Sequence, residues 1–401
     1  VENILDSNFE DGLLLWHSGN NSLEGNTLTN NTYNFGVFGS DFEDFNNNIT
    51  ASNQINDEPI IYIVNGANEI FDENEKISTI YLINCINMTV RNLQFIQNAQ
   101  GVFCFNVTGS LFQNLTVSRN SYGLDFLRSN NNNVSNIFCE NNWVGIRLEN
   151  SENNAVRSNF LIDCEKGMSL YEADVNNIEG NTFRENVFGI RLSNSNENCV
   201  YQNNFIMNNV QADLINSYQN RWDNGVEGNY WSNSELIDSN KDGILDGEYI
   251  INLNNKDYHP LLGFCGIYEI VDGTEAWDVV VISNSTVKSV TFERSNRTLK
   301  LTVEGSNETF GFCRIRVSHG LIEPELSVMI DGGIAEVTYA NYALLDDGVY
   351  RWIYFEYVHS AHEILVVPEF PFTTYCLLAI ALTIALVVFS KSCTSAKNGT
   401  K

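Results

Sequence analysis

Basic residues are scarce in this 401-residue sequence. Its 22 lysines and arginines stand against 50 aspartates and glutamates, so the formal net charge is −28. Nucleic acids and anionic lipids attract proteins through clustered positive charge, which argues against either as a partner. The nine cysteines also lack the spacing of a zinc site. An acidic surface of this kind suits bound divalent cations and a location outside a membrane.

The most prominent feature of the sequence is a strict repeat. Glycine returns every 22 residues, and each glycine opens an apolar–variable–apolar phrase, at Gly101, Gly123, Gly145, Gly167 and Gly189. A fixed period indicates stacked units, and the alternation inside each unit predicts strands. No unit carries the leucine-dense helical half of a leucine-rich repeat. The sequence therefore predicts an all-β chain built on a parallel β-helix, with coils about 4.8 Å apart.

The repeat also predicts which residues face inward. Apolar residues one and three places after each glycine should fill the core, and asparagines at a fixed place should form a ladder, as at Asn132, Asn154, Asn176 and Asn198. Asparagine also tolerates the left-handed backbone of tight turns. The column two places after each glycine should face solvent: Phe103, Asp125, Arg147, Ser169, Arg191 and Asp213.

The N-terminal third is less regular. Residues 12–33 fit one coil, whereas residues 34–78 break the rhythm and are interpreted as an excursion with its own strand. Regularity resumes at Thr79, where outward positions are apolar (Tyr81, Ile83, Phe103 and Phe105). Such a patch is either covered or used for binding, and cover by the excursion is the favoured interpretation. Because Val1 falls part-way through a coil, we expect earlier coils and a secretion signal to precede it.

An aspartate-rich loop follows the last coil. The loop matches the first nine places of a calcium-binding loop. Oxygen-bearing side chains occupy places 1, 3, 5 and 9, which are Asp238, Asn240, Asp242 and Asp246. Gly243 is at place 6, and Ile244 at place 7 would offer its backbone carbonyl. Place 12 is Tyr249, so Glu248 or Asp257 would have to replace the usual glutamate. The alternative is a turn without metal. We predict structural calcium within a cap at residues 228–262.

At this point a resemblance to a known family becomes specific. The segments Gly228-Asn229-Tyr230-Trp231-Ser232 and Asp257-Tyr258-His259-Pro260-Leu261, with Tyr33-Asn34-Phe35-Gly36-Val37, resemble NosD-like β-helix proteins, notably archaeal cell-surface members. The resemblance implies a right-handed parallel β-helix over residues 1–263. The family is named for a periplasmic copper-assembly factor. Copper needs clustered His, Cys or Met ligands, but the coils hold only His17 and scattered methionines, so no copper is expected.

The remaining sequence changes in character. Alternating strands over residues 264–366 predict a β-sandwich, in which Cys265 and Cys313 are able to pair. Residues 372–390 carry no charge and are long enough to span a bilayer. The lysines of residues 391–401 place the C-terminus in the cytoplasm. Residues 367–371 resemble an archaeal PEF-type anchoring signal, so 367–390 is interpreted as a membrane anchor and the bulk of the chain as lying outside the cell.

Two classes of function compete. The first is binding of a surface glycan or envelope protein by the outer face of the coils, through Asp125, Arg147, Tyr171, Arg191 and Asp213. The second is a polysaccharide lyase or glycoside hydrolase, for which Asp125 and Glu149 are the candidate catalytic acids. Against the second stands the interpretation of Asp125 and Arg147, and of Arg191 and Asp213, as cross-strand ion pairs. The family resemblance adds a third possibility, an accessory role in metal-cofactor assembly.

Overall fold

The computed structural model describes residues 1–322, 326–335 and 346–368. The chain divides into two compact units, with the boundary after Ile267. The predicted membrane span at 372–390, the PEF-like motif from Glu369 onward and the basic tail lie outside the described residues. Within the described part of the chain, no helix has the length and apolar character needed to cross a membrane.

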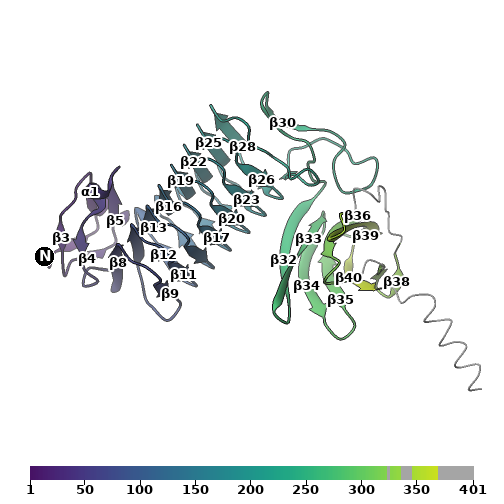
Figure 1. Ribbon diagram of the computed structural model, residues 1–401, viewed down its shortest axis with the longest axis horizontal. Helices are drawn as coiled ribbons and strands as arrows, with labels where there is room; N and C mark the ends of the chain where they lie inside the picture. The colour runs from purple at the N-terminus through teal and green to yellow at the C-terminus, as the bar shows by residue number, and fades with distance from the viewer. Residues whose placement is uncertain (323–325, 336–345, 369–401) are drawn as a thin grey trace, which may run out of the picture. The chain divides into compact units, whose positions relative to one another are not determined.

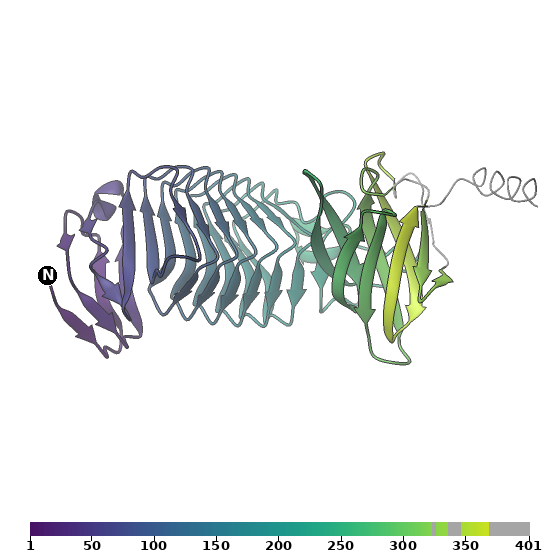
Figure 2. The same cartoon turned by 90° about the horizontal axis from the view of Figure 1, so that it is seen from below.

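The first unit is a β-helix made of three sheets (Figures 1 and 2). Apart from one antiparallel pair (β7 with β8), the strands in these sheets pair in parallel, and the register advances by 22 residues per coil over the regular region, as in Leu124 against Ile146. The main sheet contains β1 (Ile4–Asp6), β4 (Thr27–Thr29), β7 (Gln54–Ile55), β8 (Glu58–Val64), β10 (Thr79–Ile83), β13 (Gln100–Phe105), β16 (Tyr122–Leu127), β19 (Val144–Glu149), β22 (Lys166–Tyr171), β25 (Phe188–Ser193) and β28 (Val210–Ile215).

Two narrower sheets complete each coil. The second contains β9 (Ile70–Phe71), β11 (Thr89–Arg91), β14 (Leu111–Gln113), β17 (Asn133–Ser135), β20 (Ala155–Arg157), β23 (Asn177–Glu179) and β26 (Cys199–Tyr201). The third contains β12 (Gln94–Ile96), β15 (Thr116–Ser118), β18 (Phe138–Glu140), β21 (Phe160–Ile162), β24 (Thr182–Arg184), β27 (Asn204–Ile206) and β29 (Tyr230–Trp231). The predicted parallel β-helix with 22-residue coils is confirmed.

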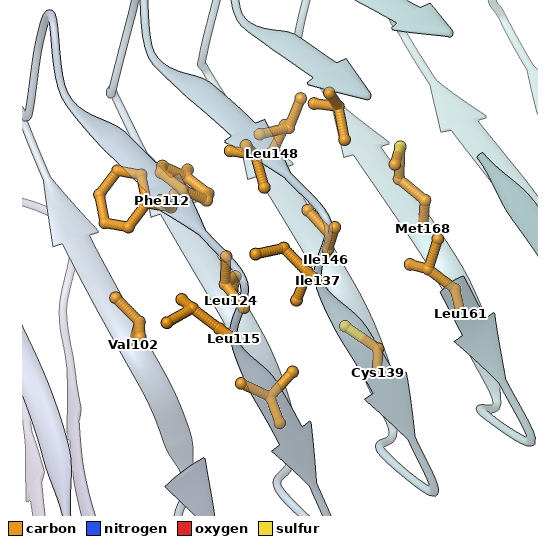
Figure 3. Close-up of a cluster of buried hydrophobic side chains, with 14 of the residues drawn as sticks. Val102, Phe112, Leu115, Leu124, Ile137, Cys139, Ile146, Leu148, Leu161 and Met168 are labelled. Atoms are coloured by element: carbon orange, nitrogen blue, oxygen red, sulfur yellow. The ribbon is translucent and has the colours of Figure 1, made fainter. Parts of the chain in front are cut away.

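The core follows the predicted columns (Figure 3). Side chains one and three places after each glycine are fully buried, as are those sixteen places after it, for example Ile146, Leu148 and Leu161. Glycine is required at the start of the phrase because the coils approach closely there. A Cβ on Gly145 would lie 2.6 Å from the carbonyl oxygen of Gly167 in the next coil.

Asparagine ladders line the turns. Asn132 donates through Nδ2 to the Oδ1 of Asn154 at 3.2 Å, and Asn154 does the same to Asn176 at 3.1 Å. A backbone N–H donates to each of these oxygens as well. These side chains are buried, so the ladder satisfies turn groups that water cannot reach. Other asparagines hold left-handed turn positions, such as Asn136 at φ 55° and Asn150 at φ 48°.

An N-terminal layer covers the outside of the first coils. It consists of the strand pairs β2 (Asp11–Trp16) with β5 (Tyr33–Phe38) and β3 (Ser22–Leu23) with β6 (Asn48–Ile49), and the short helix α1 (Phe42–Phe45). A second hydrophobic cluster joins this layer to the apolar outward residues: Leu28, Phe35, Val37, Phe45, Ile49, Ile55, Ile60, Tyr81, Ile83, Phe103, Phe105 and Leu127. The expected cover by the irregular segment is confirmed.

Two details differ from expectation. The strand of the excursion, β8, is part of the main sheet and pairs in parallel with β10. Asp125, predicted to face solvent with its column, is 0% exposed, whereas Phe103 of the same column, 1% exposed, is buried by the expected cover. Phe103 does point away from the coil interior, but Phe45 of the covering layer packs against its ring. The repeat alone contains no information about this second layer.

A stack of aromatic rings closes the C-terminal end of the β-helix. Phe205, Trp231 and Tyr249 stack in series, with ring centroids 4.3 and 4.2 Å apart. The hairpin of β30 (Tyr249–Asn252) and β31 (Asn255–Asp257) supplies the last ring and Asp257, which accepts a hydrogen bond from Trp231 Nε1 at 2.9 Å. Only glycine fits at position 228, because a Cβ there would overlap the Asp257 carboxylate.

The second unit contains two antiparallel sheets around a hydrophobic core of its own. One sheet has the order β32 (Phe264–Asp272), β33 (Glu275–Ser283), β36 (Phe310–Ser318) and β39 (Tyr350–Val358). The other has the order β34 (Thr286–Glu293), β35 (Thr298–Glu304), β40 (Ala361–Pro368), β37 (Leu326–Ile330) and β38 (Gly333–Ile334). Cys265 and Cys313 are buried and are not joined by a disulfide.

Candidate functional site

A groove lies where the N-terminal layer meets the outer face of the main sheet. It has a volume of about 380 Å³, and its lining comes from β2, β5, β16 and β19 and from the residues that flank these strands. The lining residues are Trp16, His17, Phe38, Gly39, Ser121, Tyr122, Leu127, Arg147 and Glu149. Arg147 and Glu149 belong to the predicted outer face, whereas the covering layer contributes residues from far away in the sequence.

Arg147 organises the polar side of this groove. Its Nε and Nη2 donate to the two carboxylate oxygens of Asp125 at 2.7 and 2.8 Å, and its Nη1 lies 3.0 Å from a carboxylate oxygen of Glu149. Its guanidinium also lies over the ring of Tyr122, with Cζ 4.2 Å from the ring centroid. Burial alone would lower the pKa of Arg147, but the attraction of Asp125 raises it. The guanidinium is thus fixed on its edges and on one face.

Glu149 is the acidic group that lines the groove. Its side chain is 28% exposed. Burial raises the pKa of this carboxyl, the positive charge of Arg147 opposes that rise, and the negative charge of Asp125 adds to it. Asp125 itself is fully buried beneath Arg147 and both of its oxygens are engaged. Asp125 therefore positions Arg147 and does not reach a ligand.

A row of aromatic rings forms the other side. Trp16 contacts Phe38 at a centroid distance of 5.6 Å, Phe38 contacts Tyr122 at 6.0 Å, and Tyr122 contacts Trp143 at 5.3 Å. The two ends of the row are open to solvent, since Trp16 is 64% and Trp143 45% exposed. Lys166 covers one face of Trp143, with Nζ 4.2 Å from the ring centroid. Burial raises the pKa of Tyr122 to about 12, so its hydroxyl stays protonated.

The structure separates the predicted binding face into two parts. Asp125 and Arg147 lie at the groove, whereas Arg191 and Asp213 form a separate pair at 3.1 Å on β25 and β28. Ser169 stands between them in the register. Tyr171 lies beside Glu149 in the strand register and is exposed, and the nearby charge of Glu172 raises its pKa. The two cross-strand ion pairs anticipated from the repeat are present.

The sequence prediction missed the aromatic side of the groove. Trp16 and Phe38 lie opposite each other in the β2–β5 pairing. Trp16 is four places after Gly12, the same outward place that Glu149 holds after Gly145. Large aromatic side chains at an outward place of the repeat were therefore an available signal. Their position beside Tyr122 was not, because it depends on how the N-terminal layer folds back.

The aspartate-rich loop is wound around its first member. Asp238 accepts hydrogen bonds from the backbone N–H groups of Lys241, Asp242 and Gly243 at 2.8 to 3.2 Å. Asp246 accepts one from the Ser239 N–H at 2.7 Å. Burial raises the pKa of Asp238. Across the described ranges, no three His, Cys, Asp or Glu side chains converge as a metal-binding group.

The two suggested substitutes for the twelfth ligand have other partners. Glu248 pairs with Lys256 at 2.5 Å. Asp257 accepts hydrogen bonds from the Asn229 N–H and from Trp231, in the cap. As the structure stands, neither carboxylate is available to the loop.

Comparisons with known proteins gave a family match and matches to solved structures. Residues 45–236 match the family model described as periplasmic copper-binding protein (NosD). A search of curated proteins gave no match. A crystal structure of a double mutant of the periplasmic alginate epimerase AlgG is 17% identical, covering 51% of this chain and 60% of that chain with a TM-score of 0.29. A single mutant of AlgG is 19% identical, covering 49% and 47% with a TM-score of 0.19. Each match spans less than two thirds of the epimerase chain.

Proposed function

Since the chain carries a NosD-family β-helix, we propose that it is an extracellular binding protein whose groove holds a glycan of the cell surface. In this proposal residues 372–390 anchor the chain in the membrane, and the unit at residues 264–366 is a β-sandwich spacer. The periplasmic description of the family is consistent with a location outside the cytoplasm. A neighbouring envelope protein is the second partner considered for the same face.

The observation that carries this proposal is the combination of side chains in the groove. Sugar rings have apolar faces that stack on aromatic side chains, and hydroxyl groups that exchange hydrogen bonds with polar ones. Trp16 and Tyr122 supply the aromatic surface, while Glu149, Ser121 and His17 supply polar groups. The ion pair of Arg147 with Asp125 holds the polar side in place without a ligand.

Binding is favoured over hydrolysis by the state of Asp125. A glycosidase needs two carboxyl groups that both reach the scissile bond, and Asp125 is buried with both oxygens bonded to Arg147. The raised pKa of Glu149 is the one feature typical of a general acid. A lyase or hydrolase therefore remains the alternative, with Glu149 as its acid.

A glycan array with the full chain in mild detergent, followed by calorimetry on the best ligand, tests the proposal. We expect Trp16→Ala to weaken binding roughly tenfold, equivalent to about 1.4 kcal/mol, because the exposed stacking surface is lost. The matched control is Phe160→Ala, which removes another exposed aromatic ring, from the third sheet and away from the groove. Equal effects of the two variants would contradict a role for the groove.

The same preparation separates the enzyme alternative. Reducing-sugar and unsaturated-uronate assays on each bound glycan should show no turnover. Turnover that disappears in Glu149→Gln or Asp125→Asn would replace the binding function by an enzymatic one.

We also propose that the loop of Asp238, Asn240, Asp242, Ile244 and Asp246 binds calcium as part of the cap. The spacing of these residues supports this, because oxygen ligands at places 1, 3, 5, 7 and 9 with a glycine at place 6 are typical of a calcium loop. Specific copper binding, the function in the family's name, is not part of the proposal. Stoichiometric copper binding that is lost on mutating one His or Met would contradict this.

A further inference from the structure

Given the proposed glycan site, we infer that the groove selects uncharged saccharides and rejects uronates and other anionic glycans. The argument starts from the charges that line it. Arg147 is the one cationic side chain of the lining that is charged at every pH of interest. Two carboxylates lie directly on it, Asp125 and Glu149, so the cluster carries more negative than positive charge.

Arg147 has little capacity left for a ligand carboxylate. Recognition of a carboxylate by arginine uses two parallel N–H donors in a fork. The fork formed by Nε and Nη2 is already closed on Asp125, and Nη1 is taken by Glu149. Two of the five N–H groups of Arg147 remain, but a uronate that used them would bring a third negative charge beside Asp125 and Glu149. A neutral sugar can hydrogen-bond to the remaining N–H groups and oxygen lone pairs of the groove without adding a negative charge.

Neighbouring charges do not change this balance. His17 Nδ1 lies 3.0 Å from a carboxylate oxygen of Asp44. Arg128, close enough to affect Glu149, pairs with Asp41 at 3.1 Å. Lys166 lies over Trp143, outside the groove lining. The chain as a whole carries a net charge of −28, which adds long-range repulsion of polyanions.

The test compares matched ligands that differ only at C6. Galactose and galacturonate hexamers of the same linkage, and the corresponding glucose and glucuronate pair, are titrated into the full chain at low salt beside a wider glycan array. One added carboxylate near this cluster of net negative charge should weaken binding about tenfold or more at low ionic strength. High salt should reduce the difference in affinity between the neutral and the anionic hexamers. Glu149→Gln should reduce this difference several-fold, because the substitution removes a negative charge with little change in shape.

The outcomes separate the two proposals. Neutral hexamers or array glycans that bind more tightly than their anionic counterparts, with the Glu149→Gln effect, support the inference. Uronates that bind as tightly or more tightly overturn it but leave glycan binding intact. An array on which no glycan binds overturns the proposed function and the inference with it.

Discussion

Arg147→Met is expected to destabilise the β-helix strongly, because it leaves a buried carboxylate without its partner. Asp125 is 0% exposed and the Arg147 side chain is 19% exposed. Removing one member of a buried ion pair costs about 3–5 kcal/mol. For a unit of this size, about 2–4 °C of melting temperature corresponds to each kcal/mol, so the melting temperature should fall by on the order of 10 °C.

The chain offers a matched control for this variant. Arg191 and Asp213 form a pair in the same column three coils further on, but both side chains are 30% exposed. Exposed pairs contribute about 0–1 kcal/mol, so Arg191→Met should melt within a few degrees of the natural chain. The comparison tests the effect of burial, since the residue types and the column on the main sheet are shared.

A second variant distinguishes lost charge pairing from lost packing. Adding Asp125→Asn to Arg147→Met removes the uncompensated charge and should recover most of the lost stability. Circular dichroism followed through thermal unfolding measures all four proteins. Equal melting temperatures for Arg147→Met and Arg191→Met, or no recovery in the double variant, would refute the structural role assigned to Asp125.

Three further predictions concern the ladder, the cap and the loop. Asn154→Ala should cost about 3 kcal/mol or more in unfolding free energy, since it leaves several buried turn groups unpaired, whereas Ala at the exposed Asn133 should cost little. Burial raises the pKa of Asp257 to about 7, above its unfolded value, so its contribution to stability should decline as pH rises from about 4 to about 7. Asp257→Asn should remove that slope, and the difference between the two melting-temperature curves measures it. Calcium should raise the melting temperature and EDTA should reverse the rise, and an identical response in Asp242→Ala would count against the loop.

The sequence by itself determined the coil. A residue's place in a 22-residue repeat decides whether it faces inward, because every coil meets the same neighbours above and below. Ile146 and Leu161 could be assigned to the core, and Asn154 to a ladder, from spacing alone, and the structure has all three there. The pairing of Asp125 with Arg147 followed from the same 22-residue spacing.

Tertiary structure decided what happens on the outer face. Residues 11–49 have no fixed spacing relative to the coils that they cover, so no periodicity indicates where they dock. Their position buries Phe103, which the repeat alone assigns to the outer face, and it brings Trp16 beside Tyr122. The groove exists only because the N-terminal layer folds back against the outer face of the main sheet. Contacts of that kind depend on the shape and apolar area of the two surfaces, and neither is encoded at a constant separation along the chain.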